Sequence, residues 1–486
     1  MKTVKLEFGP WEPDAALLNG AQAPEAKNCL PARRGYRPMK GLAAMQYPPL
    51  ESRAKGGFTL RSGENLLTVA ATDSGLFALE AGQWVKKHDG AAVTMGRELC
   101  SYGNSIYALF GIRLLKADLD GGTLSTFGEV ETAPNAEVMG VVRDFLVLGR
   151  LSEHPSGIHW SAIDAPTSWP AIGSDEAQFV QSDRQIFPVG GRVQAVVGGM
   201  GGVDGLVFLE NAIQRMTYVG TPYIFQFDSV DRERGLLAPK SPVVAGNLCF
   251  YLSEDGWRMT DGSLVKAIGI ERVDSWFFDK CEATRASEVR GMHDVQNRLV
   301  LWSFPSPAAE HGVHDCLLVY NYAMDKWSWC ALSTECVFPD YARGLTLEDL
   351  DAFGSLDGAA MPPLDAAAFM NGKLGVSVFD SSHRLAKLEG EPLEAVIDTA
   401  EQGGERMMCH GFRPLVDSGA AEVMPLYRSR QQDARRYGTY SRQMRDGVCR
   451  QHLSTAYLAA RVRVPAGQNW KAAVGVEALV EPEGGM

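Results

Sequence analysis

The side chains best suited to hold a metal ion lie in one short segment of this chain. His311, His314 and Cys316 are spaced HxxHxC within the stretch EHGVHDC. Imidazole and thiolate groups are the usual ligands of zinc, but a structural zinc site takes four of them, normally from two clusters. No CxxC and no second cluster accompanies this one. The sequence therefore predicts no metal site and no cofactor.

Three further patterns could carry chemistry, and each has a structural explanation. The run GGMGGVDG at 198–205 lacks the GK[ST] end and following helix of a phosphate-binding loop, which favours a simple turn. The stretch SEDGW at 253–257 is one residue short of the Asp-box turns of propeller sialidases. Asp349 and Asp351 lie in an acidic loop, where we expect solvated carboxylates. Because GxSxG and HExxH are also absent, we predict no enzymatic activity.

Aromatic residues gather in LLVYNYAMDKWSW at 317–329. Tyr320, a turn and Trp327 together resemble half of a kelch repeat, as found in partner-binding and some oxidase propellers. The upstream strand lacks the glycine pair of such repeats, and no second copy follows. We therefore expect Tyr320, Trp327 and Trp329 to belong to a strand core rather than to a ligand cage.

Charge is distributed unevenly along the chain. The net charge is −12, which argues against general affinity for nucleic acid. The segment 406–463, however, has eleven arginines, no lysine and four acids, about +7, which leaves about −19 elsewhere. We expect a partner interface here, because guanidinium groups bind carboxylates in a bidentate manner. The candidate residues are Arg428, Arg430, Arg435, Arg436, Arg442 and Arg445. Two alternatives remain: a solvated basic loop, or arginines that line a channel and grip DNA.

The composition is that of a folded, strand-rich protein. Of 486 residues, 45% are hydrophobic and 51 are glycine, which favours an all-β fold with many turns. No apolar run approaches the roughly 18–20 residues that span a bilayer. The N-terminus has no uninterrupted apolar segment typical of a secretion signal, so we expect synthesis in the cytoplasm. Nine scattered cysteines then indicate buried, reduced thiols.

An internal repeat indicates the architecture. An Asn or Asp followed by an apolar strand recurs at intervals of 39, 40, 60, 43, 50 and 74 residues. Short strands at such spacing are typical of β-propeller blades, so we predict a propeller of six or seven blades. Unrelated hairpins in a β-sandwich are the alternative. The seven anchors are Asn65, Asn104, Asp144, Asp204, Asn247, Asn297 and Asn371.

The stretch GLVFLENAIQRMTYVGTPYIFQF at 205–227 supports the propeller. Its strands mix apolar and polar residues on both faces, which a sheet with one wet face would not do. A blade packed between two neighbouring blades has both faces covered. On this basis we expect an extended N-terminal arm at residues 1–59, a β-propeller at 60–390, and a small C-terminal β-domain with a basic insertion at 391–486.

Several stretches together resemble the tail nozzle, or tail stabilisation (head-completion), proteins of short-tailed, podovirus-like bacteriophages. The stretches are KNCLPARRGYRPMKGL (27–42), IHWSAIDAPTSW (158–169), residues 205–257, IGIERVDSWFF (268–278) and RVRVPAGQNW (461–470). The resemblance covers most of the chain, without a motif as specific as a metal signature.

This resemblance implies a structural virion protein without an enzymatic site. It implies a homohexameric ring below the portal and adaptor proteins, to which tail fibres or a needle attach. Phage DNA would be retained in and ejected through its lumen without sequence-specific binding, and an acidic wall would keep the duplex from sticking. The expected location is the virion tail, after synthesis in the host bacterial cytoplasm.

Two other functions remain open at this stage. One is a stand-alone propeller enzyme or carbohydrate-binding protein, which acids and aromatics converging on the propeller axis would favour. The other is a receptor-binding adhesin, although the coiled-coil and β-helix stretches common in adhesins are absent.

Overall fold

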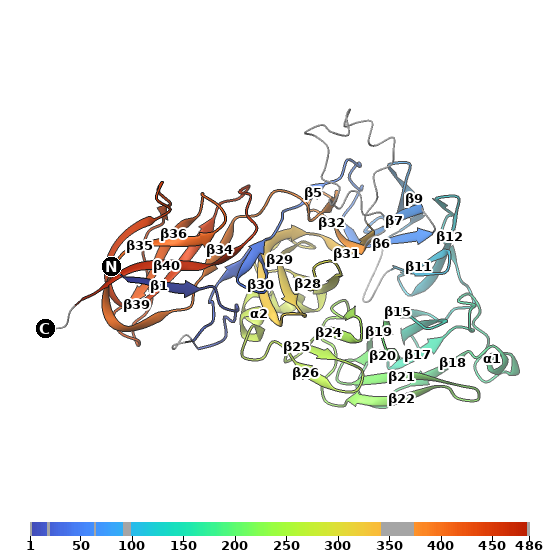
Figure 1. Ribbon diagram of the computed structural model, residues 1–486. Coiled ribbons are helices and arrows are strands. Elements are labelled where there is room, and N and C mark those ends of the chain that lie inside the picture. The colour runs from blue at the N-terminus through green and yellow to red at the C-terminus, as the bar shows by residue number, and fades with distance from the viewer. Residues whose placement is uncertain (1, 17–19, 63–64, 91–98, 342–373, 484–486) are drawn as a thin grey trace.

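The computed structural model describes residues 2–16, 20–62, 65–90, 99–341 and 374–483, and over these the chain is all-β. Figure 1 shows blades arranged around a common centre, with a second β-domain beside them that carries both chain ends. The predicted β-propeller is confirmed. The predicted acidic pair Asp349 and Asp351 lies outside the described residues.

Six of the propeller's blades are separate antiparallel sheets of four or five strands. The first blade contains β6 (Ala54–Ser62), β7 (Asn65–Thr72), β8 (Gly75–Glu80) and β9 (Gln83–Asp89). The second contains β10 (Leu99–Tyr102), β11 (Ser105–Phe110), β12 (Arg113–Asp120), β13 (Thr123–Leu124) and β14 (Gly128–Glu129). The third contains β15 (Ala136–Val142), β16 (Phe145–Leu151), β17 (Gly157–Trp160) and β18 (Asp183–Ile186). The next two contain β19 (Val193–Met200), β20 (Val203–Leu209), β21 (Ile213–Gly220) and β22 (Ile224–Asp231); and β23 (Val243–Ala245), β24 (Leu248–Ser253), β25 (Gly256–Thr260) and β26 (Val265–Ala267). The last contains β31 (Cys336–Tyr341), β32 (Leu374–Phe379), β33 (Leu385–Lys387) and, from the N-terminal region, β5 (Ala43–Ala44).

A seventh four-stranded unit stands in the same ring but is not a separate sheet. It consists of β27 (Arg290–Asp294), β28 (Leu299–Phe304), β29 (His314–Asn321) and β30 (Lys326–Thr334). Its strand β30 pairs with β2 (Ala26–Lys27), and through β2 the sheet continues into the C-terminal domain. Six self-contained blades and this shared one therefore make up the propeller.

The predicted repeat marks the second strand of every unit. Asn104, Asp144 and Asn247 directly precede β11, β16 and β24, and Asn65 is the first residue of β7. The anchor Asn371 lies outside the described residues, just ahead of β32. In the blades that begin with β10, β15, β19 and β23, only two residues separate the first strand from the second, a tight turn in which Asn, Asp and Gly are favoured.

Strand β20 shows why both faces of the stretch at 205–227 are mixed. Leu206 and Phe208 pack into one hydrophobic cluster, together with Tyr251 of the following blade. Val207 and Leu209 pack on the other face into a different cluster. All four are fully buried, so the expectation that neighbouring blades cover both faces is confirmed.

Glu335 closes the ring between the last blade and the first. Its Oε2 accepts a hydrogen bond from the Ala54 N–H at the start of β6, at 2.9 Å. Its Oε1 lies 2.5 Å from Nδ1 of His383. One buried carboxylate therefore joins two blades that are distant in sequence.

The C-terminal domain is built around two long strands, β35 (Gln402–Val416) and β39 (Cys449–Val464). β35 pairs with β39 and with β40 (Ala473–Pro482), while β39 also pairs with β34 (Ala395–Asp398) and β36 (Glu422–Arg428). The predicted basic insertion follows β36 and returns along its edge as β37 (Arg436–Tyr437) and β38 (Ser441–Arg442).

The N-terminal segment, expected as an extended arm at residues 1–59, is attached to both domains by short strands. Strand β1 (Lys2–Glu7) pairs with β40. Strands β3 (Cys29–Pro31) and β4 (Tyr36–Pro38) form a hairpin, and β4 also pairs with β40. Strand β5 pairs with β33 and belongs to a blade. The first blade begins at Ala54, ahead of the expected boundary at residue 60. Strands of two or three residues carry too little pattern to be recognised in sequence.

Helix α2 (Asp274–Lys280) receives its N-terminal cap from this same segment. Its N-cap residue, Val273, has no side chain able to accept a hydrogen bond. The carboxylate of Asp14 accepts instead from the N–H groups of Ser275 and Trp276, at 2.7 and 2.8 Å. The remaining helices are α1 (Asp175–Phe179) and the 3₁₀ helix η1 (Ala283–Glu288). No helix in the described part of the chain is long and apolar enough to cross a membrane.

Acid is expected to destabilise the blade that contains His159. Burial, with a smaller effect of Arg184, lowers the pKa of His159 to about 4. Below its ordinary pKa near 6.5 the unfolded chain takes up a proton that the folded blade does not, so stability falls as pH drops from about 6.5 towards 4. His159 alone contributes about 2 kcal/mol to the loss of stability between pH 7 and 5. Urea denaturation at both pH values should show this loss in wild type and a smaller one in His159→Phe. An equal pH dependence in the two proteins would contradict it.

Candidate functional sites

The six candidate interface arginines divide into two that bind one buried carboxylate and four that are exposed. Arg428 and Arg435 both bind the carboxylate of Glu401, with Nε–Oε distances of 3.0 and 3.1 Å. Arg428 and Glu401 are each only 8% exposed, and the Arg428 guanidinium also lies over the ring of Tyr457. The guanidinium groups of these two arginines are thus engaged within the domain, whereas the other four candidates are exposed.

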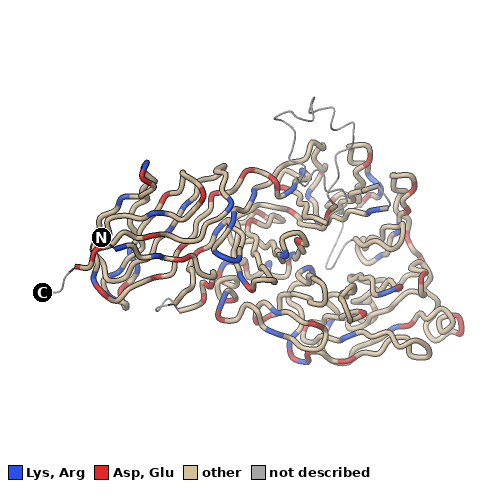
Figure 2. Tube along the Cα trace, viewed as in Figure 1, with Lys and Arg blue, Asp and Glu red and all other residues tan. Residues whose placement is uncertain are grey.

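The exposed arginines follow the edge of β36 and the turns beside it. Arg442 pairs with Glu422 at 3.1 Å, yet its side chain is 89% exposed. Arg430, Arg436 and Arg445 are exposed, and none forms an ion pair with another residue that the structure describes. We call these four residues, together with Tyr437 and Met444, the arginine surface. Figure 2 shows the C-terminal domain beside the propeller, with its basic residues in blue.

The arginine surface has the composition of a protein interface. Tyr437 and Met444 are 59% and 57% exposed, unusually high for large apolar side chains. Arginine, tyrosine and methionine are the residue types enriched where proteins meet. Beneath them, the Arg461–Asp398 and Arg463–Glu422 ion pairs fix β39 to its neighbours. The surface is therefore presented on a rigid sheet.

The predicted HxxHxC residues do not converge. His311 is exposed, whereas Cys316 lies in the hydrophobic core. The Nδ1 atom of His314 is 2.9 Å from the hydroxyl of Ser303. Among the described residues, no group of three His, Cys, Asp or Glu side chains is placed to hold a metal ion.

The other sequence patterns have structural roles. GGMGGVDG forms the turn from β19 to β20, where Gly199 and Gly202 have φ angles of +77° and +82° that favour glycine. In SEDGW, Asp255 binds Arg258 and Arg234, and the Arg258 hydrogen bonds lower its pKa to about 2.

The kelch-like aromatics belong to the core, as expected. Tyr320 stacks on Trp327 with ring centroids 4.3 Å apart. Trp327 is fully buried and Trp329 nearly so. All nine cysteines are free in the structure, and eight of them are buried, with Cys100 only partly so.

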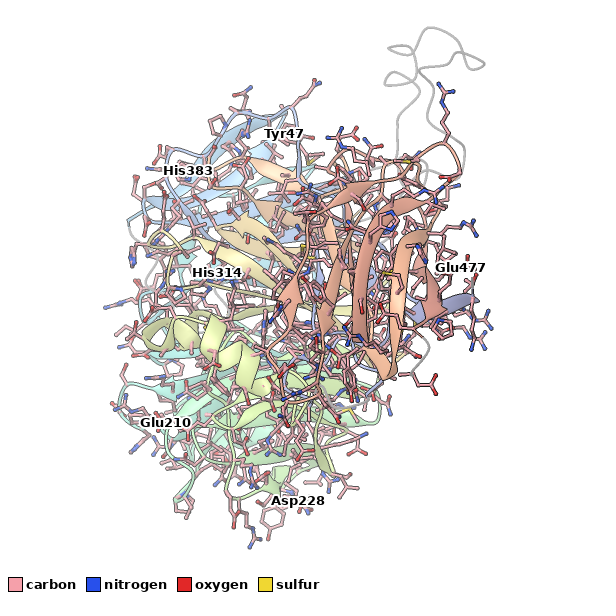
Figure 3. The ribbon with its side chains drawn as sticks, turned by 90° about the vertical axis from the view of Figure 1, so that its left-hand side faces the viewer. Tyr47, Glu210, Asp228, His314, His383 and Glu477 are labelled. Atoms are coloured by element: carbon pink, nitrogen blue, oxygen red, sulfur yellow. The ribbon has the colours of Figure 1, made fainter. Side chains whose placement is uncertain are left out.

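A cavity of about 210 Å³ lies where the innermost strands of four consecutive blades begin. Its wall includes basic side chains and two carboxylates that were not predicted as site residues from the sequence. They are Arg53, Lys55, Lys240, Arg290, Glu288 and Glu335. His314 also lines this cavity. Figure 3 labels His314 and His383 on the propeller and Glu477 on the C-terminal domain. A cation near the start of several inner strands is the sequence signal that could have revealed it.

No protein-family model and no curated protein sequence matches this chain. Among solved structures, the extracellular domain of a hybrid two-component system protein of B. thetaiotaomicron is 9% identical, with a TM-score of 0.38, over 86% of this chain and 47% of that one. Hsv2 of Kluyveromyces lactis is 11% identical, with a TM-score of 0.32, over 57% of this chain and 84% of that one. The chain thus spans about half the length of the first of these proteins.

Proposed function

We propose that this protein is a structural component of the tail nozzle of a short-tailed bacteriophage. It assembles as a homohexameric ring and contacts neighbouring tail proteins through the arginine surface. The observation that carries the proposal is that surface: exposed arginines with Tyr437 and Met444, on a sheet held rigid by buried ion pairs. The sequence resemblance supplies the kind of assembly.

The charge balance supports a role as a conduit. Outside residues 406–463 the chain carries about −19, and like charge keeps a DNA duplex from adhering to a wall it slides along. The arginines would then face protein carboxylates of the portal or adaptor ring, or of a fibre or needle protein, rather than DNA.

The alternative function is a stand-alone propeller enzyme or carbohydrate-binding protein. Such a site calls for acids and aromatics gathered on one face of the propeller. The cavity at the start of the inner strands instead has four basic side chains in its wall. This composition favours the structural role over a glycan-processing one.

Electron microscopy of the particle that co-purifies with a tagged copy from producing cells tests the assembly. Six copies around an open channel, attached to other tail proteins, are expected. A solitary propeller that co-purifies with no tail protein would refute the nozzle and revive the alternative.

Charge reversal tests the arginine surface. Arg430→Glu, Arg436→Glu and Arg445→Glu together should reduce incorporation into tails more than about tenfold, since losing interface anchors costs about 2–4 kcal/mol. The melting temperature should stay within a few degrees of wild type, because all three side chains are exposed.

The matched control reverses three exposed arginines of the propeller, Arg184, Arg192 and Arg232. This variant carries the same charge change and should assemble as wild type does. Normal incorporation of the arginine-surface variant, or an equal defect in both, would rule out the proposed contact.

A further inference from the structure

The cavity at the start of the inner strands is a built feature of the propeller rather than a surface irregularity. Arg290 is the first residue of β27, Lys240 precedes β23, and Arg53 and Lys55 lie at the start of β6. These strands belong to blades that follow one another around the ring, so one recess collects cations from distant parts of the sequence.

Several of these cations are held in place by neighbouring groups. Lys55 Nζ and Arg53 Nε share the carboxylate of Asp73, at 2.6 and 3.3 Å. Arg290 donates to the Lys55 carbonyl and to Cys336 Sγ. The basic side chains are thus preorganised, which reduces the entropy that a bound ligand would cost.

Each of the two carboxylates of the wall accepts a hydrogen bond from a neighbouring group. Glu288 accepts from the guanidinium of Arg285, at 2.9 Å from Nη2 to Oε2. Glu335 accepts from the Ala54 N–H and lies 2.5 Å from His383. With Asp73 and Arg285 counted, five cationic side chains and three carboxylates lie in or beside the wall, which leaves an excess of two positive charges apart from the histidines.

The lowered pKa of His314 is consistent with this positive charge. Burial lowers its pKa to about 3, and the nearby charges of Arg290, Arg285 and Lys240 contribute to the decrease. A histidine that stays neutral here adds no charge of its own. The cavity therefore has a positive electrostatic potential in a partly buried setting, which favours the binding of an anion.

We propose that this cavity binds a small, doubly charged oxyanion of the phosphate class, either inorganic phosphate or the phosphate group of a phosphomonoester. Two negative charges match the excess of two positive charges. Guanidinium and ammonium donors are the side chains best suited to phosphate oxygens. The volume of about 210 Å³ exceeds what the ion alone needs and leaves room for a small attached group. This inference does not depend on the proposed assembly.

Isothermal titration of the full chain with inorganic phosphate, at constant ionic strength, tests the site. One phosphate should bind per chain, and saturating phosphate should raise the melting temperature, since a ligand that binds only the folded state stabilises it. Lys240→Gln should weaken binding at least about tenfold, because it removes one of the charges that face the ion.

Lys116→Gln is the matched control, because Lys116 lies in another blade and pairs with Asp118. It should bind phosphate as wild type does. If Lys240→Gln fails to fold, Arg53→Gln is used in its place. No heat and no thermal shift with wild type, or equal binding by Lys240→Gln and wild type, would overturn the proposal.

A parallel titration with glucose 1-phosphate distinguishes the two sources of the phosphate group. Tighter binding than for inorganic phosphate would support a phosphomonoester ligand that uses the remaining volume. Binding of inorganic phosphate alone would support the free ion. Glucose without phosphate should not bind, and its binding at equal strength would refute an oxyanion site.

Discussion

Arg428→Ala is expected to lower the free energy of unfolding of the C-terminal domain by about 3–5 kcal/mol. The guanidinium of Arg428 binds Glu401 through Nε and Nη2, and both residues are 8% exposed. Without it, Glu401 keeps Arg435, at 3.1 Å, as its one charged partner in the described part of the chain. A buried carboxylate that loses its main partner destabilises far more than the intact pair stabilises.

Urea denaturation followed by circular dichroism measures this loss. Arg436→Ala is the matched control, since it removes an exposed arginine of the same segment and should change stability by less than about 0.5 kcal/mol. The double variant Arg428→Met with Glu401→Leu removes both charges and should lose less than Arg428→Ala alone. Equal stability of Arg428→Ala and Arg436→Ala would contradict the assigned role of the buried pair.

Trp11→Ala should detach the N-terminal segment from the propeller and cost about 3–5 kcal/mol. The Trp11 side chain is fully buried, with its ring centroid 4.7 Å from that of Trp276 on α2. Asp14, three residues later, caps the same helix. Loss of the indole would remove both the packing and the alignment of the cap.

Trypsin digestion together with thermal denaturation measures the effect. Cleavage at Lys27 and Arg33, which precede the first blade, should become rapid in Trp11→Ala and remain slow in wild type. Trp11→Phe keeps an aromatic ring and removes an indole N–H that has no hydrogen-bond partner among the described residues, so it should lose much less stability. Unchanged protection of the segment in Trp11→Ala would refute this anchoring.

The propeller could be predicted because its signal is repeated and local. Asn104, Asp144 and Asn247 each stand in a two-residue turn into an apolar strand, and that turn chemistry depends only on neighbouring residues. The pairing of β2 could not be predicted. Lys27 pairs with Trp329 and Val396, and nothing in a two-residue strand specifies partners so far away.

The arginine-rich segment was recognised from composition alone, which could not separate its two kinds of arginine. Arg435 and Arg436 are adjacent and identical in type, yet the first binds Glu401 and the second is exposed. The difference lies in the distant carboxylate of Glu401. Likewise, the cations of the cavity come from separate blades and meet only when the ring closes.

The sheet that passes from β30 through β2 to β34 makes the propeller and the C-terminal domain mechanically one body. The main-chain N–H of Asn28 donates to the Trp329 carbonyl at 2.8 Å, and its side-chain Oδ1 accepts from Ala331 N–H at 2.7 Å. A load applied to either domain is carried in part by these bonds and by the Lys27–Val396 pairing. Tension on the C-terminal domain is therefore transmitted directly to the outer strand of a blade, instead of being taken up by a hinge.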